Sequence, residues 1–387
     1  MKHQFKIIVV FICILLSNPF AYSAEDNNLS KAIDSLFDNR EGRPGCAVGV
    51  INNGEYIHKR GYGLANLEHN ISIDENSIFR IGSISKQFTA MAIAILEEKG
   101  LLAFDDEMQK HIPDLIDYGE KVTINQMIHH FSGLGDYEYM DYPGRFRNAV
   151  DEEFRWGNED YLTNEEFYAL IKTLPLIRKP ERKFWYSNTG YALLTLVAQN
   201  VSGLSLRELA KRDIFKPLAM NDSFFNDDVN LIIKDRADAY SPVKGKPSQY
   251  KINMTNLSWV GDGGVHTSLN DFIKWDQNFY DNKLGAADVS LIKTMEETYT
   301  ETKVKKRNQK MSRDQKTYAF AQNLAYYNGY KRWSHSGSWV GYLAHYTRFP
   351  ELSFSTAVFC NTNEIDATMI ADDIVDLFFE MKQESSD

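Results

Sequence analysis

Cysteine and basic residues are both scarce in this sequence. Its three cysteines are too few for a disulfide scaffold. Its 43 Lys and Arg residues are outnumbered by 53 Asp and Glu, and the net charge of −10 argues against a general nucleic-acid binder, which needs a basic surface to displace counterions from phosphates. Aromatic residues are plentiful: 21 Tyr, 23 Phe and 6 Trp can bury a large core, which excludes intrinsic disorder. The 387 residues allow two domains or one large domain with an insertion.

Several widespread catalytic motifs are missing as well. No Gly-x-Ser-x-Gly elbow, His-Glu-x-x-His, Walker loop or Cys-x-x-Cys occurs. His129 and His130 have no carboxylate at metal-ligand spacing, so we interpret them as structural. The glycine-rich run 261–264 resembles a phosphate-binding loop only superficially, because it lacks the lysine and the preceding strand.

The start of the chain has the shape of a secretory signal peptide. Lys2 and Lys6 precede an unbroken apolar run, residues 7–16, and a short polar segment rich in small residues follows. The run is about half as long as a membrane-spanning helix, and no later stretch approaches ~18 apolar residues. Lipid attachment at Cys13 is disfavoured because this residue lies inside the run. We expect a signal peptide over residues 1–24 and an exported, soluble mature chain, periplasmic or secreted, with no transmembrane segment.

Strand patterns occur near both ends of the mature chain. Residues 45–52 and 55–63 predict two strands joined by a tight Asn-Gly turn, a strong hairpin signal. Helical patterns flank the strands at 28–39 and 366–382. Near the C-terminus, aromatic and β-branched runs separated by Gly or Pro indicate a three-stranded meander, at residues 329–335, 342–349 and 353–360.

The long middle of the chain is mostly helical in its periodicity, for example at 87–99 and 189–202. The simplest topology is an α+β fold: an antiparallel sheet of five or more strands, flanked by the N- and C-terminal helices, with a large helical insertion. We expect residues 25–82 and 318–387 to form the sheet part and residues 83–317 the helical part. The site is expected where the two parts meet, because clefts between domains are preferred ligand sites.

The leading candidate for chemistry is the Ser-x-x-Lys motif at Ser83 and Lys86, directly before the helical pattern at 87–99. On a helix, positions i and i+3 share a face, so the hydroxyl and the ammonium can meet. A helix N-terminus favours a neutral lysine and a developing oxyanion, and a serine nucleophile needs such help. That helix is apolar on nearly every face and must therefore be buried. A polar Ser-Lys pair at the start of a buried helix indicates a functional role. The same spacing recurs at Ser241 and Lys244, Ser248 and Lys251, and Ser290 and Lys293.

Two further motifs carry polar groups that suit group transfer. Tyr186 offers a phenol that can move a proton if a nearby ammonium lowers its pKa, and Asn188 offers an amide that can hold a carbonyl. The same Tyr-x-Asn pattern occurs at 280–282 and 326–328. His335 stands one residue before a glycine at the end of a predicted strand, where a substrate backbone can lie against the sheet edge. A histidine alone is more often structural.

Taken in this order along the chain, the three motifs resemble those of the penicillin-recognising serine hydrolases. The resemblance is to the branch with class C β-lactamases, D-alanyl-D-alanine carboxypeptidases, D-aminopeptidases and related esterases, and it implies a β-lactamase/transpeptidase-like fold. It covers nearly the whole mature chain and is carried by FRIGSISKQFTAMAIAILEEKGLLAFDD at 79–106, TINQMIHHFSGLGDY at 123–137, YSNTGYALLTLVAQNVSG at 186–203, GDGGVHTSLNDFIKW at 261–275 and HSGSWVGYLAHYTRFP at 335–350.

The resemblance implies an acyl-enzyme mechanism that needs no metal or organic cofactor. Ser83 would attack a carbonyl while Lys86 and Tyr186 manage the proton, and the backbone N–H groups of Ser83 and Ser338 would form the oxyanion hole. The substrate-binding residues that it implies are Asn188, His335, Gly337 and Ser338.

The third motif is also where the subfamilies differ. Class C β-lactamases resembling this chain carry Lys-Thr-Gly there, whereas His-x-Gly, present here at 335–337, is typical of carboxypeptidase, aminopeptidase and esterase members. We therefore expect a hydrolase acting on a D-amino-acid peptide, peptidoglycan fragments included, or on a small ester. A class C-like β-lactamase and a catalytically quiet peptidoglycan-binding protein are the alternatives. Glu181, where relatives usually have glycine, and residues 318–321, which replace a glycine-rich strand, leave the substrate open.

The same resemblance brings the two cysteines of the mature chain together. In this fold the first strand pairs antiparallel with the last, which places Cys46 near Cys360. A cross-strand disulfide and two buried free thiols are both open at this point, since Cα atoms more than ~7 Å apart cannot be bridged.

Overall fold

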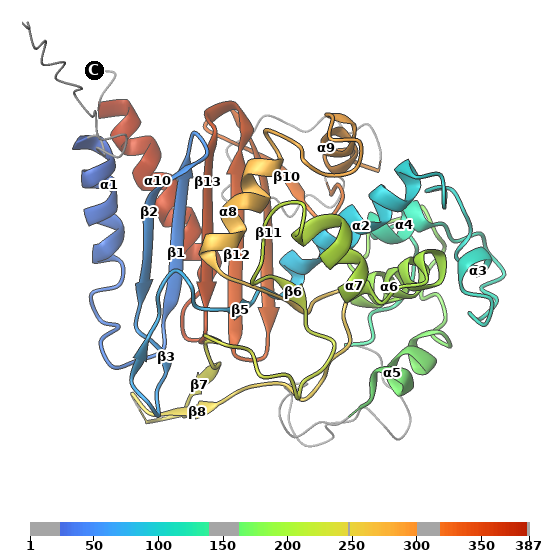
Figure 1. Cartoon of the computed structure of the whole chain (residues 1–387), viewed down its shortest axis with the longest axis horizontal. Helices are drawn as coiled ribbons and strands as arrows, with labels where there is room; N and C mark the ends of the chain where they lie inside the picture. Colours follow the sequence, from blue (N-terminus) through green and yellow to red (C-terminus); the bar gives the residue numbers. More distant parts are fainter. Residues whose placement is uncertain (1–23, 139–161, 247, 300–317, 385–387) are drawn as a thin grey trace, which may run out of the picture.

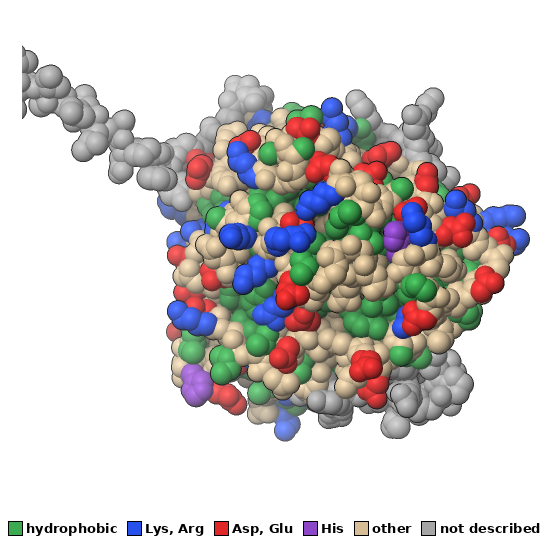
Figure 2. Space-filling model, turned by 45° about the vertical axis from the view of Figure 1, so that its right-hand side comes forward, with side chains coloured by type: hydrophobic (Ala, Val, Ile, Leu, Met, Phe, Trp, Pro, Cys, Tyr) green, Lys and Arg blue, Asp and Glu red, His purple; other side chains and the backbone are tan. Residues whose placement is uncertain are grey.

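The computed structural model describes residues 24–138, 162–246, 248–299 and 318–384. The predicted signal peptide falls outside these ranges except for Ala24, where helix α1 (Ala24–Ser35) begins. None of the helices in these ranges combines the length and the apolar character that a membrane span requires. On the face shown in Figure 2, acidic and basic side chains are interspersed among hydrophobic ones.

One six-stranded antiparallel sheet is built from both ends of the chain, as the sequence predicts (Figure 1). Asn53 and Gly54 both have positive φ, which a two-residue hairpin turn of this kind requires, and they join the first two strands. The edge strand β10 was not expected. The order is β10 (Asn323–Tyr327), β11 (Tyr330–Trp339), β12 (Tyr342–Phe349), β13 (Phe354–Cys360), β1 (Cys46–Asn52) and β2 (Glu55–Tyr62).

Helices α1 and α10 (Ala367–Glu384) lie side by side on one face of this sheet (Figure 1). The pleat of β1 directs every second residue toward them, so Cys46, Val48 and Val50 join a buried cluster with Ile33 of α1 and Ile374 of α10. The first and last helices of the chain are therefore fastened to the central strands by one shared apolar layer.

Cys46 and Cys360 are bonded as a disulfide within this layer. They are register partners on β1 and β13, their Cα atoms lie 4.0 Å apart, and both side chains are buried. Of the two possibilities left open by the sequence, the structure contains the bridge and not the free thiols. The bond closes a loop across a sequence separation of 314 residues, so it constrains the unfolded chain strongly.

Replacing both cysteines by alanine is expected to lower the free energy of unfolding by about 6 kcal/mol, the chain-entropy value for a loop of this sequence separation. The change is measured by guanidinium denaturation of the mature protein. Wild-type protein treated with reductant should show the same shift, whereas the double variant should not respond to reductant. Equal numbers of reactive thiols in unfolded protein with and without reductant would show that no bridge is present.

The opposite face of the sheet packs against the helical part of the chain. Ala47, Tyr346 and Phe359 of the sheet share a large buried cluster with α2 (Lys86–Glu98), α6 (Asn188–Ser202) and α8 (Leu269–Asn278). Residues 86–96 of α2 are all buried, as its apolar sequence predicts. This core contains residues on both sides of the predicted boundary at 82/83, and the division into two parts stays a prediction.

Short strands interrupt the helical part more often than its periodicity predicts, because two or three residues are too few to show alternation. The strand β5 (Phe79–Arg80) pairs with β9 (Val265–Thr267) and leads into a 3₁₀ turn at Gly82–Ser85 and then α2. The remaining α-helices and strands are α3 (Met108–His111), α4 (Ile124–Ile128), α5 (Asn164–Ile171), α7 (Leu206–Ala210), α9 (Ser290–Met295), β3 (Leu64–Asn66), β4 (Ile71–Ser72), β6 (Phe224–Phe225), β7 (Tyr240–Pro242) and β8 (Tyr250–Ile252). A π-helical turn at Lys211–Phe215 and a 3₁₀ turn at Pro350–Leu352 complete them.

Candidate active site

Ser83 and Lys86 meet at the start of α2. Ser83 lies in the 3₁₀ turn rather than in the helix itself, and Lys86 is the first helical residue. In a 3₁₀ turn the side chains at i and i+3 eclipse, so the expected contact forms: Lys86 Nζ donates to Ser83 Oγ at 3.0 Å. Ser83 is partly exposed and opens into a small cleft, while Lys86 is fully buried beneath it.

Three acceptors surround the buried Lys86 ammonium. Besides Ser83 Oγ, Nζ donates to Asn188 Oδ1 at 2.7 Å and to the main-chain carbonyl of Asp262 at 2.6 Å. An ammonium has three donors, so each of them has a partner. Asn188 comes from the first turn of α6 and Asp262 from the glycine-rich loop before β9, so one cation joins three distant segments. The loop that resembled a phosphate cradle therefore helps to hold this lysine.

Tyr186 lies beside this pair. The Lys86 Nζ atom is 5.0 Å from the centre of its ring. Burial raises the pKa of Tyr186 above its ordinary value, while the Lys86 charge and hydrogen bonding with Lys86 and Ser83 lower it, and the net direction is upward. The phenol is therefore protonated at neutral pH and can donate a proton in this resting state. Ser187 caps α6 by accepting from the Gly190 N–H, which fixes the tyrosine and the asparagine on either side of it.

Two glycines let the end of β11 approach the turn that carries Ser83. A Cβ at Gly337 would lie 2.0 Å from the Ile81 carbonyl oxygen and 3.3 Å from the Ser83 nitrogen. A Cβ at Gly82, whose φ is +51°, would lie 2.5 Å from the Ser338 nitrogen. The missing side chains thus let the backbone of Ser83 lie close to that of Ser338, and both residues line the cleft, as the predicted oxyanion hole requires.

His335 is buried behind the cleft instead of lining it. Its Nδ1 donates to the Ser336 carbonyl at 2.6 Å, and its Nε2 then accepts from the Tyr318 hydroxyl at 2.9 Å. Burial, followed by the Lys86 charge, lowers the pKa of His335 to about 4, so the ring is neutral at physiological pH. A direct contact between this side chain and a substrate stays a prediction.

His130, interpreted as structural from the sequence, packs against the face of Tyr186 with ring centres 4.3 Å apart. Its Nδ1 accepts from the Ser187 N–H at 3.1 Å. The ring therefore supports Tyr186 from behind, as a positioning residue. Among the described residues, no group of three or more His, Cys, Asp or Glu side chains is arranged to hold a metal ion.

Three acidic residues near the cleft were not predicted as site residues: Asp136, Glu138 and Asp262. Asp136 is fully engaged, because its oxygens accept from the N–H groups of Asn188 (2.9 Å) and Glu138 (3.0 Å). Glu138 and Asp262 line the cleft together with Ser83, and so do Arg80 and Trp339. The segments at 123–137 and 261–275, which carry the family resemblance, were the only sequence signal near these residues. A sequence segment does not show which side chains are buried or which point into the cleft.

The other matches to these motifs lie elsewhere. Ser290 and Lys293 are on α9, where the Ser290 hydroxyl donates to Asp288. Ser248 accepts from Arg43 at 2.7 Å. Ser241 follows Tyr240 in β7 and accepts from Asn253 at 2.6 Å. The contact with a buried lysine distinguishes Ser83 from all of them.

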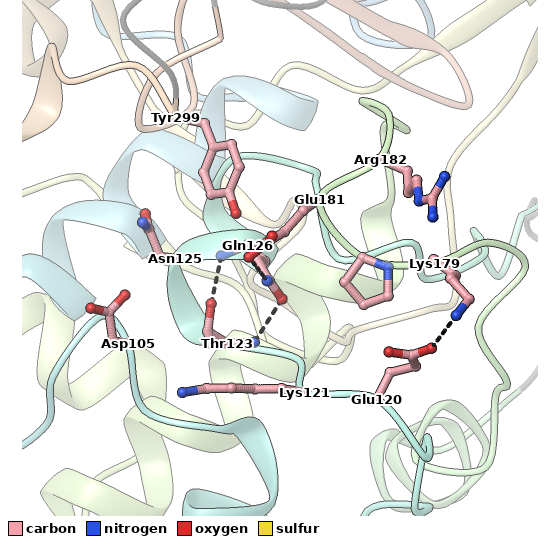
Figure 3. Close-up of a pocket in the computed structure, with 11 residues that line it drawn as sticks. Asp105, Glu120, Lys121, Thr123, Asn125, Gln126, Lys179, Glu181, Arg182 and Tyr299 are labelled. Carbon is pink, nitrogen blue, oxygen red and sulfur yellow. Dashed lines mark hydrogen bonds and ion pairs between the residues drawn. The ribbon is translucent and has the colours of Figure 1, made fainter.

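A second cavity, of about 340 Å³, is polar and does not include Ser83 (Figure 3). Gln126 lies at its centre, exchanging hydrogen bonds with Thr123 and donating to Glu181 Oε1 at 3.0 Å (Figure 3). Glu181 has φ +63°, a conformation that favours glycine, which accounts for the glycine expected at this position. The glutamate that replaces the usual glycine at position 181 therefore lines this second cavity, not the cleft beside Ser83.

Comparison with known proteins gives one consistent result. The family model described as Beta-lactamase matches residues 33–378. Penicillin-binding protein 4* of Bacillus subtilis (strain 168) is 28% identical over 244 residues, 59% of this chain and 50% of that protein. The D-aminopeptidase of Gluconobacter oxydans (strain 621H) is 28% identical over 246 residues, 63% and 44% of the two chains. The chain thus spans about half the length of these curated relatives.

Among solved structures, the octameric penicillin-binding protein homologue from Pyrococcus abyssi superposes with a TM-score of 0.76. It is 27% identical, and the match covers 92% of this chain and 77% of that one. The fold likeness therefore includes both the sheet and the helical part.

Proposed function

The chain belongs to the β-lactamase family of serine hydrolases, and from this premise we propose that it forms an acyl-enzyme at Ser83 and hydrolyses a D-amino-acid peptide or a small ester. The observation that carries the proposal is the 3.0 Å contact between Ser83 Oγ and the buried Lys86 Nζ at the base of the cleft. A serine hydroxyl is a weak nucleophile until a neighbouring group takes its proton.

The proposed reaction has two halves. Ser83 Oγ attacks the substrate carbonyl carbon, and its proton passes to Lys86 Nζ, which must first release one proton from its ammonium form to solvent. The carbonyl oxygen becomes an oxyanion between the N–H groups of Ser83 and Ser338. The protonated Tyr186 then donates to the leaving amine or alcohol, and the C–N or C–O bond breaks. In the second half a water molecule attacks the ester carbonyl, gives its proton to the Lys86–Tyr186 pair, and releases the acid and Ser83.

Asn188 has a defined place in this scheme. Its amide oxygen accepts from Lys86, so its NH₂ group is the part that remains to bind a substrate carbonyl. We propose that Asn188 orients the substrate amide in this way. The main-chain edge at Gly337 and Ser338 would receive the substrate on the other side of the cleft.

Gly337→Ala is expected to lower kcat/KM by about 10²- to 10³-fold, the usual cost of losing one oxyanion donor. The added methyl group would lie 2.0 Å from the Ile81 carbonyl oxygen, which is backbone and cannot swing aside, so β11 must move away from Ser83. Steady-state hydrolysis of a chromogenic ester measures the loss. Ser336→Ala, one residue earlier and exposed, is the matched control and should retain wild-type activity. Equal activity of the two variants would contradict the proposed role of this strand.

We also propose that the protein is exported and works in the periplasm or outside the cell. The N-terminal pattern supports this location, and so does the Cys46–Cys360 disulfide, because such bonds persist in oxidising compartments. Peptidoglycan fragments are D-amino-acid peptides found there and are included in the proposed substrate class.

A parallel assay of the mature protein tests the function. The four substrates are a D-Ala-D-Ala peptide, a D-amino-acid amide, a short acyl ester and a chromogenic cephalosporin. The proposal expects turnover of one or more of the first three at rates far above that of the cephalosporin. Efficient cephalosporin hydrolysis with none of the others would establish the β-lactamase alternative.

A further inference from the structure

The cleft beside Ser83 carries an unusual set of charges. Its lining includes the carboxylates of Glu138 and Asp262 and the guanidinium of Arg80. They come from three separate parts of the chain: the segment after α4, the loop before β9, and β5. With both acids ionised, these three side chains give the lining a net charge of −1. A cationic group on the substrate would complete the charge balance.

Asp262 has one carboxylate oxygen held and one without a partner. Its Oδ2 accepts from the Tyr137 hydroxyl at 2.6 Å, and that hydroxyl in turn accepts from Trp259 Nε1 at 3.0 Å. The side chain is 5% exposed, and its Oδ1 has no hydrogen-bond partner within the described part of the chain. Leaving a buried carboxylate oxygen without a donor is costly, so an N–H group arriving with a ligand would be bound favourably.

Glu138 lines the same cleft as Asp262. Its main-chain N–H is fixed by Asp136 Oδ1, while its own carboxylate makes no hydrogen bond to the residues that the structure describes. Burial and the charges of Asp136 and Asp262 raise the pKa of Glu138 to about 8, and the Lys86 charge only partly opposes them. An arriving cation would stabilise its ionised form.

We propose that Glu138 and Asp262 bind the free α-ammonium group of the substrate whose carbonyl Ser83 attacks. The inference rests on the proposed function and narrows it: the substrate is an amide, ester or peptide with an unblocked D-amino acid at the acyl end. The ammonium donates one N–H to Asp262 Oδ1 and places its charge beside Glu138. An N-acylated substrate has neither the charge nor the donors, so the same two carboxylates disfavour it.

Arg80 is the feature that a rival substrate would use. It is 5% exposed, stacks on the Trp339 ring at 5.0 Å, and donates no hydrogen bond to the described residues. A substrate carboxylate would fit it, as in a carboxypeptidase. However, burial lowers the pKa of Arg80 and the Asp262 charge offsets this, so the guanidinium already faces an acid with which a substrate carboxylate would have to compete. The lining therefore favours a cation.

Calorimetric titration of Ser83→Ala tests the inference without any turnover. D-alaninamide is expected to bind on the order of 100-fold more tightly than N-acetyl-D-alaninamide. Adding Glu138→Gln, which keeps the shape and removes the charge, should reduce the ratio to within about threefold. Adding Glu68→Gln, the same change at an exposed position away from the cleft, should leave it intact. Equal affinity of Ser83→Ala for the two amides would overturn the proposal.

Kinetics of the wild-type enzyme separate this inference from the function on which it rests. D-alanine and N-acetyl-D-alanine p-nitrophenyl esters should differ in kcat/KM on the order of 100-fold, in favour of the free amine, with a loss of this preference in Glu138→Gln. Hydrolysis of both esters at the same rate would overturn the inference and leave the hydrolase proposal standing. Failure to hydrolyse these esters and also the peptide, amide and acyl ester of the parallel assay would overturn the proposed function, while the titrations above still decide the ammonium site. Selective cleavage of N-acyl-D-Ala-D-Ala, lost in Arg80→Gln, would assign the cleft to a carboxylate and also overturn the inference.

Discussion

Ser83→Ala is expected to reduce kcat about 10⁶-fold, to the level left by binding and the oxyanion donors alone, while the protein remains folded. The reason is that the attacking atom itself is removed, and no other described serine touches a buried lysine. Stability should fall by about 1–3 kcal/mol, because the variant removes the acceptor of one N–H of the buried Lys86 ammonium. Hydrolysis of the preferred substrate and covalent labelling by a fluorescent penicillin provide the two measurements.

Ser85→Ala is the matched control, two residues away in the same motif. The Ser85 hydroxyl is fully buried and accepts from the Val265 N–H at 3.0 Å, so its removal leaves that donor unpaired and should cost about 1–3 kcal/mol of stability. Its activity and its labelling should persist. The two variants therefore lose comparable stability but differ in activity. Full activity in Ser83→Ala, or labelling of another residue, would contradict the mechanism.

The sheet was largely predictable because its signals are local. The Asn-Gly turn between β1 and β2 has the two positive φ values that such a turn requires, and the alternating runs at the C-terminus became β11, β12 and β13. Strands such as β5 and β9 have only two and three residues, too few for a periodic pattern, and they exist because neighbours in space supply their hydrogen bonds. The disulfide needed the register of β1 against β13, which a family likeness indicated and only coordinates could measure.

The site divides in the same way. Ser83 and Lys86 are three residues apart, so local geometry brings them together in either kind of helical turn. Glu138 and Asp262 are 124 positions apart and share no pattern. Their meeting at one cleft, and the Asp262 Oδ1 atom that has no partner among the described residues, are properties of the tertiary structure. The predicted contact of His335 with a substrate stays a prediction. The structure adds that both ring nitrogens have partners inside the protein, which the motif could not show.

Replacing Lys86 by methionine should lower kcat/KM about 10⁴-fold, at the upper end of what proton transfer contributes. Arginine at this position should not rescue activity, because a planar guanidinium cannot reproduce three contacts arranged around one nitrogen and does not deprotonate. Lys99→Met, at the other end of α2 and exposed, is the control and should change stability by no more than about 1 kcal/mol. Near-wild-type turnover in Lys86→Met would remove the lysine from the mechanism.

The same variant should also become more sensitive to alkaline pH. Burial raises the pKa values of Asp136, Glu138 and Asp262 above those of the unfolded chain, and the Lys86 charge holds them down. An acid whose folded pKa is raised binds more protons when folded, so stability falls as pH rises from the unfolded value of ~4 to the folded one, which is about 8 for Glu138. Without the Lys86 charge these pKa values rise further, so the pH range over which stability falls extends to higher pH. The free energy of unfolding of Lys86→Met, measured by denaturant titration from pH 5 to 9, should therefore fall further below that of the wild type at each step. A constant difference would mean that Lys86 does not balance these acids.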